Sequence, residues 1–185
     1  MRQLVLSIFI FAWAAGISYA ISFMHGMHKV EFQNDISTVK FNSLQFKEDY
    51  AIVHLLTEEC GCSQIIAEYL IQRGKIDDVK EFVYFIGQSK EYKQDLEAKG
   101  FIIEEIENQF IQGVPMLSIF SKDGELKYSG GYSQSIITPI TKIQDKKILS
   151  QIKKNISSEK FVVQGCATSK SIIGQIDPLR IKYKR

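Results

Sequence analysis

Two cysteines separated by one residue carry the strongest chemical signal in this 185-residue sequence. The motif Cys60-Gly61-Cys62 follows a continuous apolar run, Tyr50–Thr57, and precedes a segment whose apolar residues recur at helical spacing. We therefore expect both thiols where a buried strand ends and a helix begins. Unpaired N–H groups at a helix start stabilise a thiolate, the species that attacks disulfides and binds soft metals. The motif predicts thiol–disulfide exchange or a copper or zinc site at Cys60 and Cys62; a third interpretation makes them inert loop residues.

A bond between Cys60 and Cys62 is feasible, because Cα atoms two positions apart can fall within the window of about 4.4–6.8 Å that disulfides occupy. The short ring is expected to be strained, and strain makes a disulfide easier to reduce. Such a pair suits disulfide donation or shuffling better than strong reduction. We expect Cys60 to be the more accessible, attacking thiol and Cys62 to resolve the mixed disulfide, while the adjacent carboxylates of Glu58 and Glu59 oppose thiolate formation.

The third cysteine, Cys166, lies more than a hundred residues further along the chain. It precedes a second helical pattern, Thr168–Ile176, so it too would lie near a helix start. Its sequence context fits a resolving thiol or a third metal ligand. It also fits a buried, inert cysteine, because cysteine is among the most buried residue types.

The remaining pattern predicts the elements that would position these thiols. A tight hairpin is expected at Lys122-Asp123-Gly124, because Asp-Gly favours two-residue turns. Strand, helix, strand followed by a hairpin predicts an α/β fold: a mixed β-sheet flanked by helices. The predicted strands are 37–44, 50–57, 79–86, 101–103, 116–121, 125–129 and, as strand or extended chain, 161–163; the predicted helices are 65–73, 90–99, 145–154 and 168–176.

The segment Gln3–Met24 contains no charged side chain. Its 22 residues, at about 1.5 Å per residue, suffice to span the hydrocarbon core of a membrane. Ser18-Tyr19-Ala20 also resembles a signal-peptide cleavage site, so we consider an uncleaved anchor, a cleaved signal and a buried helix of a soluble protein. Arg2 favours a cytoplasmic amino end. Both export interpretations place the remaining chain in an oxidising, periplasmic or extracellular compartment, where disulfides persist.

The net charge is only +2, from 23 basic and 21 acidic residues that are interleaved along the chain. No strongly basic surface is expected from this pattern, and nucleic acid is therefore not an expected partner.

With these motifs in view, residues 50–156 resemble the thioredoxin-like superfamily. The resemblance rests on the strand–Cys60-Gly61-Cys62–helix arrangement and on the segment Gln112–Phe120, which contains Val114-Pro115. It implies that Pro115 is a cis proline facing the redox pair and that Val114 lends its backbone to a bound substrate segment. The chain has Glu59 where the family usually has Trp, and one residue fewer between the cysteines. An alternative alignment pairs Cys60 with Ser63.

These observations predict a membrane anchor at residues 1–24, a tether and early strand at 25–48, a thioredoxin-like domain at 49–156 and a C-terminal extension with a short helix at 157–185. The expected function is that of a membrane-tethered thiol–disulfide oxidoreductase or isomerase acting on protein disulfides outside the cytoplasm. Its partners would be protein thiol or disulfide clients and a thiol electron donor or acceptor. The alternatives are a copper or zinc carrier and a non-catalytic interaction module.

Overall fold

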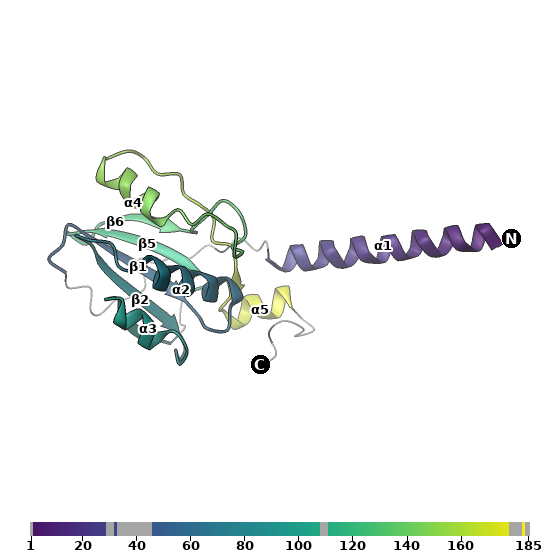
Figure 1. Ribbon diagram of the computed structural model, residues 1–185, viewed down its shortest axis with the longest axis horizontal. Helices are drawn as coiled ribbons and strands as arrows, with labels where there is room; N and C mark the ends of the chain where they lie inside the picture. The colour runs from purple at the N-terminus through teal and green to yellow at the C-terminus, as the bar shows by residue number, and fades with distance from the viewer. Residues whose placement is uncertain (1, 29–31, 33–45, 108–110, 178–182, 184–185) are drawn as a thin grey trace.

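The computed structural model describes residues 2–28, 32, 46–107, 111–177 and 183 (Figure 1). Five strands form a mixed sheet in the order β3-β2-β1-β5-β6, and two short strands, β4 and β7, form a second sheet. The elements in chain order are α1 Arg2–His28, β1 Tyr50–Leu56, α2 Gly61–Arg73, β2 Lys80–Ile86, α3 Lys93–Ala98, β3 Ile102–Ile106, β4 Gly113–Val114, β5 Met116–Ser121, β6 Leu126–Gly130, α4 Asp145–Lys153, β7 Cys166–Ala167 and α5 Lys170–Ile176.

The central strand, β1, pairs in parallel with β2 on one side and antiparallel with β5 on the other. Six of its seven residues are buried, which explains why its sequence is continuously apolar instead of alternating. The mixed α/β sheet expected from the sequence is therefore confirmed. The Asp123-Gly124 turn between β5 and β6 is also confirmed, with the Gly124 N–H donating to the Ser121 carbonyl at 2.8 Å.

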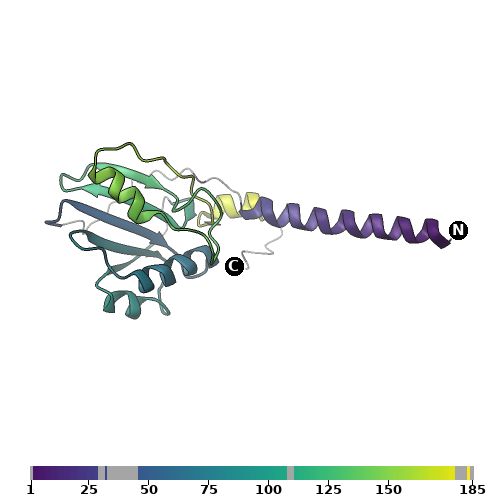
Figure 2. The ribbon, with the colours of Figure 1, turned by 45° about the horizontal axis from the view of Figure 1, so that its top comes forward.

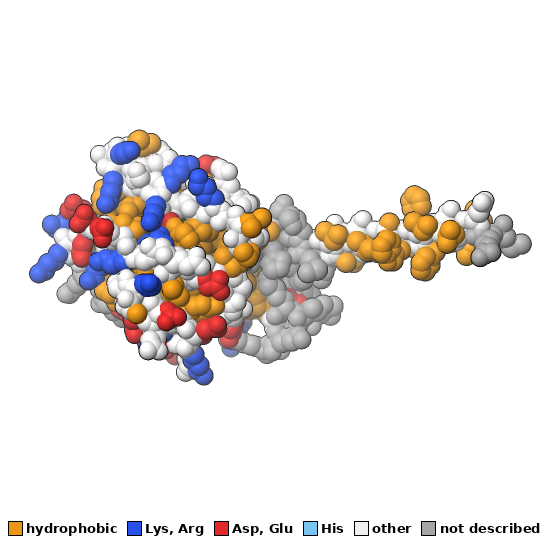
Figure 3. Space-filling model, viewed as in Figure 1, with side chains coloured by type: hydrophobic (Ala, Val, Ile, Leu, Met, Phe, Trp, Pro, Cys, Tyr) orange, Lys and Arg blue, Asp and Glu red, His pale blue; other side chains and the backbone are white. Residues whose placement is uncertain are grey.

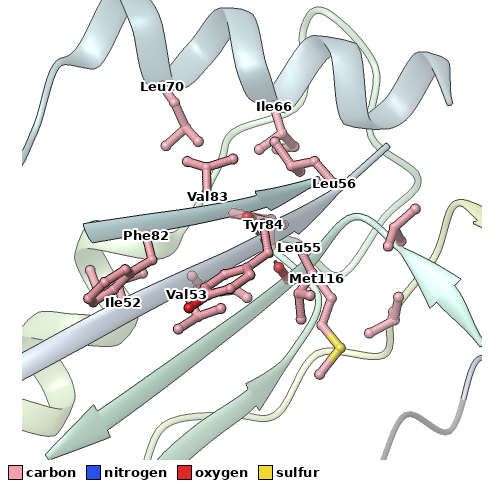
Figure 4. Packing of buried hydrophobic residues seen from close by; sticks show 14 of the residues in the cluster. Ile52, Val53, Leu55, Leu56, Ile66, Leu70, Phe82, Val83, Tyr84 and Met116 are labelled. Carbon is pink, nitrogen blue, oxygen red and sulfur yellow. Dashed lines mark hydrogen bonds between the residues drawn. The ribbon is translucent and has the colours of Figure 1, made fainter. Parts of the chain in front are cut away.

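The hydrophobic core lies on both faces of this sheet. Figure 4 shows Ile66 and Leu70 projecting from α2 toward the sheet, where Val83 of β2 meets them. The neighbouring residues of β2, Phe82 and Tyr84, point to the opposite face, as the two-residue repeat of a strand requires (Figure 4). Figures 1 and 2 show α2 between α3 and α4.

Several boundaries and two strands differ from the sequence prediction. The predicted early strand at 37–44 lies outside the described residues. The segment 161–163, predicted as strand or extended chain, forms no regular strand. Val163 makes an isolated bridge with Phe32, and the Phe161 carbonyl accepts the Gly131 N–H at 2.8 Å. The helix predicted from Lys90 begins at Lys93. Strands β4 and β7 were not predicted, because a two-residue strand has no periodicity that a sequence pattern can reveal.

Helix α1 is long and apolar enough to cross a membrane, by length and composition, over Gln3–Ser22. It projects away from the α/β domain, and the space-filling view shows its apolar side chains uncovered (Figures 1 and 3). None of the Gln3–Ser22 window is buried. The interpretation as a core helix of a soluble protein is therefore wrong, whereas an anchor and a signal sequence share the observed features.

A buried polar network joins the sheet to the last turn of α2 and to α4. Arg73 Nη2 lies 2.6 Å from Glu81 Oε2, and Arg73 Nε lies 3.1 Å from Asp145 Oδ2. His54 of β1 contacts Glu81 at 3.0 Å through Nε2 and the Tyr132 hydroxyl at 2.8 Å through Nδ1. Burial alone would raise the pKa of Glu81, but hydrogen bonds and charge from His54 and Arg73 lower it to about 2.

This network predicts an acid-dependent stability. Glu81 titrates near pH 4.5 when unfolded and near pH 2 when folded, so its contribution is fully present above pH 4.5 and is lost as the pH falls through 2. We expect Glu81→Gln to remove roughly 3 kcal/mol of the pH dependence of the unfolding free energy between pH 6 and pH 2. Urea unfolding of the full chain in detergent micelles measures this, with exposed Glu97→Gln as the control. An unchanged pH slope in Glu81→Gln would contradict the assignment.

Candidate functional site

Cys60 lies directly between β1 and α2, where it caps the amino end of the helix. Its backbone is extended, with φ −110° and ψ 115°, and its carbonyl accepts the Gln64 N–H at 2.9 Å. Its own N–H donates to the Thr57 carbonyl at 3.2 Å, which closes the turn after β1. The predicted placement of the motif between a buried strand and a helix is thus confirmed.

Cys60 forms a disulfide with Cys166, across a Cα–Cα distance of 5.8 Å and a sequence separation of 106 residues. The expected Cys60–Cys62 bond is therefore not formed in this structure, where Cys60 is bonded to Cys166 instead. The reason is that the chain beyond α4 returns to the start of α2 and brings a third sulfur into the range that a disulfide needs. The expectation that Cys60 is the more accessible thiol is also wrong, since its exposed fraction is 0%, against 8% for Cys62 and 6% for Cys166.

Cys62 lies in the first turn of α2, outside the disulfide. Its Sγ is 3.6 Å from the carbonyl oxygen of Ile137, in the segment that connects β6 to α4, and donates a weak hydrogen bond to it. Ser63, the partner in the alternative alignment, is 1% exposed, and its hydroxyl has no hydrogen-bond partner among the described residues. The first turn of α2 therefore carries a thiol and a hydroxyl away from solvent.

The Val114–Pro115 peptide lies against the disulfide. This peptide bond is cis, as the resemblance implied for Pro115. The pairing of β1 with β5 reaches Leu55 opposite Met116, so the residues just before β5 lie at the end of the sheet where β1 leads into Cys60. Cys60 Sγ is accordingly 3.9 Å from the Val114 carbonyl oxygen.

The segment that carries Cys166 runs antiparallel to the segment that carries Val114. Val114 pairs with Cys166, and Gly113 pairs with Ala167. The ladder continues with Thr168, whose N–H donates to the Gln112 carbonyl at 2.9 Å and whose hydroxyl donates to the Ile111 carbonyl. The edge of β4 is therefore occupied by β7 in this structure.

The backbones of β4 and of the segment before Cys166 approach so closely that only glycine fits at position 165. A Cβ at this position would collide with the Val114 carbonyl oxygen and would lie 2.8 Å from Pro115 Cδ. Because these atoms belong to the backbone of β4 and to the proline ring that follows it, they cannot move aside as the end of a flexible side chain could. By contrast, a Cβ at Gly174 in α5 would meet nothing within 4 Å.

A residue close to the carboxyl end adds a further contact to this segment. The Tyr183 hydroxyl accepts the N–H of Ala167 at 2.8 Å, and the Tyr183 N–H donates to Asp177 at 2.9 Å. Burial raises the pKa of Tyr183; the hydrogen bond from Ala167 lowers it, and the acidic groups of Asp177 and Cys62 raise it again. These hydrogen bonds attach Tyr183 to β7, next to Cys166.

Glu58 has a structural partner that sequence reasoning missed. Its carboxylate accepts the Ser89 hydroxyl at 2.7 Å and the backbone N–H of Glu91 at 2.9 Å. Burial would raise its pKa, but these hydrogen bonds and those from Lys90 and Tyr92 lower it. The carboxylate therefore ties the turn after β1 to the loop after β2.

No group of three or more His, Cys, Asp or Glu side chains suited to a metal ion occurs among the described residues. The Cys60–Cys166 bond uses two of the three sulfurs, and a disulfide sulfur is not a thiolate ligand. The residues present in this oxidised form do not make a copper or zinc centre at Cys60 and Cys62.

The family model described as "Domain of unknown function (DUF6436)" matches residues 29–169. The chain belongs to the DUF6436 family. No curated protein matches it significantly. A hypothetical protein from Sinorhizobium meliloti 1021 is similar in structure, with a TM-score of 0.49 and 12% identity over 65% of this chain and 79% of that one. An uncharacterized conserved protein from Geobacillus kaustophilus gives a TM-score of 0.45 and 17% identity over 65% of this chain and 77% of that one.

The cysteine pairing of this DUF6436 protein can be checked directly. After unfolding without reductant, we expect iodoacetamide to modify mainly Cys62, because the other two cysteines are bonded to each other. Trypsin should then release peptide 48–73, alkylated once, linked to peptide 161–170. Mass spectrometry of this linked pair before and after reduction measures the result. A modified Cys166 with an internal bond in peptide 48–73 as the main species would contradict it.

Proposed function

We propose that this protein is a membrane-tethered thiol–disulfide oxidoreductase that exchanges disulfides with proteins outside the cytoplasm. The observation that carries the proposal is a disulfide at the start of α2, Cys60–Cys166, with a further thiol, Cys62, in the first turn of the same helix. Three sulfurs gathered at one helix start provide both a bond to donate and a thiol to exchange with it.

The domain is proposed to be thioredoxin-like. Support comes from the succession of buried strand, cysteine and helix, and from the parallel β1–β2 pair beside the antiparallel β5–β6 pair. The position of Val114-Pro115 against the cysteine that caps α2 also agrees with that family. Under this proposal Cys60 is the catalytic sulfur, and Val114 and Pro115 bound the place where a client segment reacts.

The chemistry follows from the start of α2. The first N–H groups of the helix lack intrahelical partners, and their dipoles favour negative charge on a sulfur at the N-cap. In oxidation of a client, a client thiolate attacks Cys60, the S–S bond to its partner breaks, and that partner leaves as a thiolate that takes up a proton. A second client thiol then attacks the mixed disulfide and releases Cys60. Two electrons and two protons pass from the client to the protein, and an external disulfide oxidant restores the bond.

The tether is α1. A helix with Arg2 at its start and an uncharged Gln3–Ser22 span favours a cytoplasmic amino end and a domain on the opposite side of the membrane. This placement supplies the oxidising surroundings in which a disulfide persists. We therefore assign the domain to the periplasmic or extracellular side.

One observation favours a second function, that of a non-catalytic interaction module. In that case the disulfide is a structural staple, meaning a bond that stabilises the fold and takes no part in exchange. Cys60 is fully buried, and the bond closes a loop of about a hundred residues. In the chain-entropy description such a bond stabilises the fold by about 4–5 kcal/mol. The staple and the oxidoreductase differ in whether the bond opens under mild reducing conditions.

Redox equilibration separates the two functions. The full chain in detergent micelles is equilibrated in glutathione buffers, quenched with acid and alkylated, and its intact mass is measured by mass spectrometry. We expect reversible opening at potentials between about −270 and −180 mV, the range of known exchange proteins. A bond that stays closed below about −300 mV would identify a staple.

Client oxidation tests the activity itself. The oxidised wild-type protein should accelerate the return of activity to reduced, unfolded ribonuclease A, and Cys60→Ser should reduce the rate to the background of buffer alone, because no sulfur at the N-cap remains to exchange. Exposed Ser157→Ala serves as the control with full activity. Equal rates for the wild type and Cys60→Ser would refute Cys60 as the reacting sulfur.

A further inference from the structure

The β4 edge pairs with a segment of the same chain. Strand β7 pairs with Gly113 and Val114, and Thr168 extends the ladder to Gln112 and Ile111. An added strand of this kind is recognised through its backbone, so any extended segment that tolerates the side-chain environment can take its place. The environment demands a glycine where Gly165 meets the Val114 carbonyl and a cysteine where Cys166 meets Cys60.

The internal segment also has the covalent chemistry of a reaction partner. Cys166 is bonded to the sulfur that caps α2, and it lies directly opposite Val114 in the ladder. Under the proposed function this is the arrangement of a mixed disulfide, with the partner segment supplied by the same chain. Cys60 is the sulfur that a client would have to reach. It is buried in this structure, where it is bonded to Cys166 in the segment that pairs with β4.

An exchange between the three cysteines of the chain would open this edge. In such a step the Cys62 thiolate would attack Cys60 and form a Cys60–Cys62 bond while the Cys60–Cys166 bond breaks, and Cys166 would leave as a thiolate that takes the proton given up by Cys62. The number of disulfides and of thiols is unchanged, so no external oxidant or reductant is needed. Once its covalent link is gone, β7 is held by the β4 ladder, by the Tyr183 hydroxyl and by packing around Gly165.

We propose that Gly165–Thr168 is a built-in occupant of the β4 edge and that Cys62 expels it by exchange at Cys60, which opens this edge to an extended, cysteine-bearing segment of a client protein. This inference rests on the proposed function, and it adds the class of ligand and the device that controls access. Cys166 is the internal competitor of the client cysteine, and Cys62 is the thiol that selects between the closed and open forms.

A peptide that copies the internal segment tests the occupancy. The probe is Val-Gln-Gly-Cys-Ala-Thr-Ser, residues 163–169, carried as a mixed disulfide with thionitrobenzoate and added to the reduced full chain in detergent micelles. Release of thionitrobenzoate reports the reaction, and peptide mapping locates the attachment. In Gly165→Val the internal segment no longer fits, so capture of the probe at Cys60 should be about tenfold faster or more than in the wild type.

The matched control is Gly174→Ala, which adds a Cβ in the same extension where nothing lies within 4 Å and should react like the wild type. A probe in which valine replaces the glycine should not fit the edge either, so the Gly165→Val protein should capture it no faster than the wild type does. Thr168→Val removes the hydroxyl that donates to the Ile111 carbonyl and gives a second, milder variant, with an expected increase of about threefold. Circular dichroism confirms that each variant is folded.

The exchange step has its own readout. Oxidised wild-type protein, held at pH 8.5 and quenched with acid, should contain a fraction with a Cys60–Cys62 bond and an alkylatable Cys166, whereas Cys62→Ser should contain none. Equal probe capture by the wild type, Gly165→Val and Thr168→Val, together with normal exchange with glutathione, would overturn the occupancy and leave the proposed function standing. Absence of exchange with both glutathione and the probe in every variant would overturn both.

Discussion

The register between β1 and β5 determines where the chemistry of this protein lies. The pairing places Leu55 opposite Met116 and so brings the exit of β1 and the approach to β5 to one end of the sheet. Cys60 follows the first strand after a short turn, and one residue, Pro115, separates Val114 from the start of the second. A shift of one residue would turn every β5 side chain to the other face and would disrupt the packing of two strands that are buried on both faces. The contact between Cys60 and Val114 is thus a consequence of core packing.

Helix α2 is held at both ends by different interactions. Its first turn is covalently linked to β7 through Cys60, and its last turn carries Arg73, which lies between Glu81 of β2 and Asp145 of α4. Removing one partner from such a buried ionic group leaves uncompensated charge, which is strongly destabilising. Between these ends, Ile66 and Leu70 pack on the sheet. The cysteine that caps the helix is therefore presented by a rigid element, as an exchange reaction at a defined sulfur requires.

The sequence predicted the parts of the fold that repeat locally. The apolar run of β1, the helical spacing of α2 with Arg73 in its last turn, and the Asp123-Gly124 turn each contain their signal within about a dozen residues. The position of Cys60 at the strand–helix junction was predicted for the same reason, because it depends on neighbours in the chain. The cis bond before Pro115 was predicted only from the resemblance to the thioredoxin-like superfamily. The sulfur pairing was not, because three cysteines permit three different bonds and only the tertiary structure chooses among them.

The missed strand pair explains the wrong choice of disulfide. Strands β4 and β7 are two residues long, and they form through contacts between segments some fifty residues apart in the sequence. Gly165 was the available signal: a glycine directly before a cysteine, well beyond the last regular strand, indicates a close approach of backbone to backbone. Such a glycine does not identify the opposing segment, however, so Val114 could be recognised as its neighbour only in three dimensions.

The burial of Cys60 is compatible with its proposed reactivity, because Cys60 is bonded to β7, a short strand of the C-terminal extension. A sulfur enclosed by the sheet alone could react only by unfolding, and its bond would serve as a staple. Cys60 is instead bonded to a two-residue strand that belongs to an extension, and a further thiol, Cys62, lies two residues away on the same helix. A staple gains nothing from that additional thiol, which offers a route for the staple to rearrange. A site that must close and reopen needs both: a partner sulfur that fills the edge, and a nearby thiol that can replace it without a change in oxidation state.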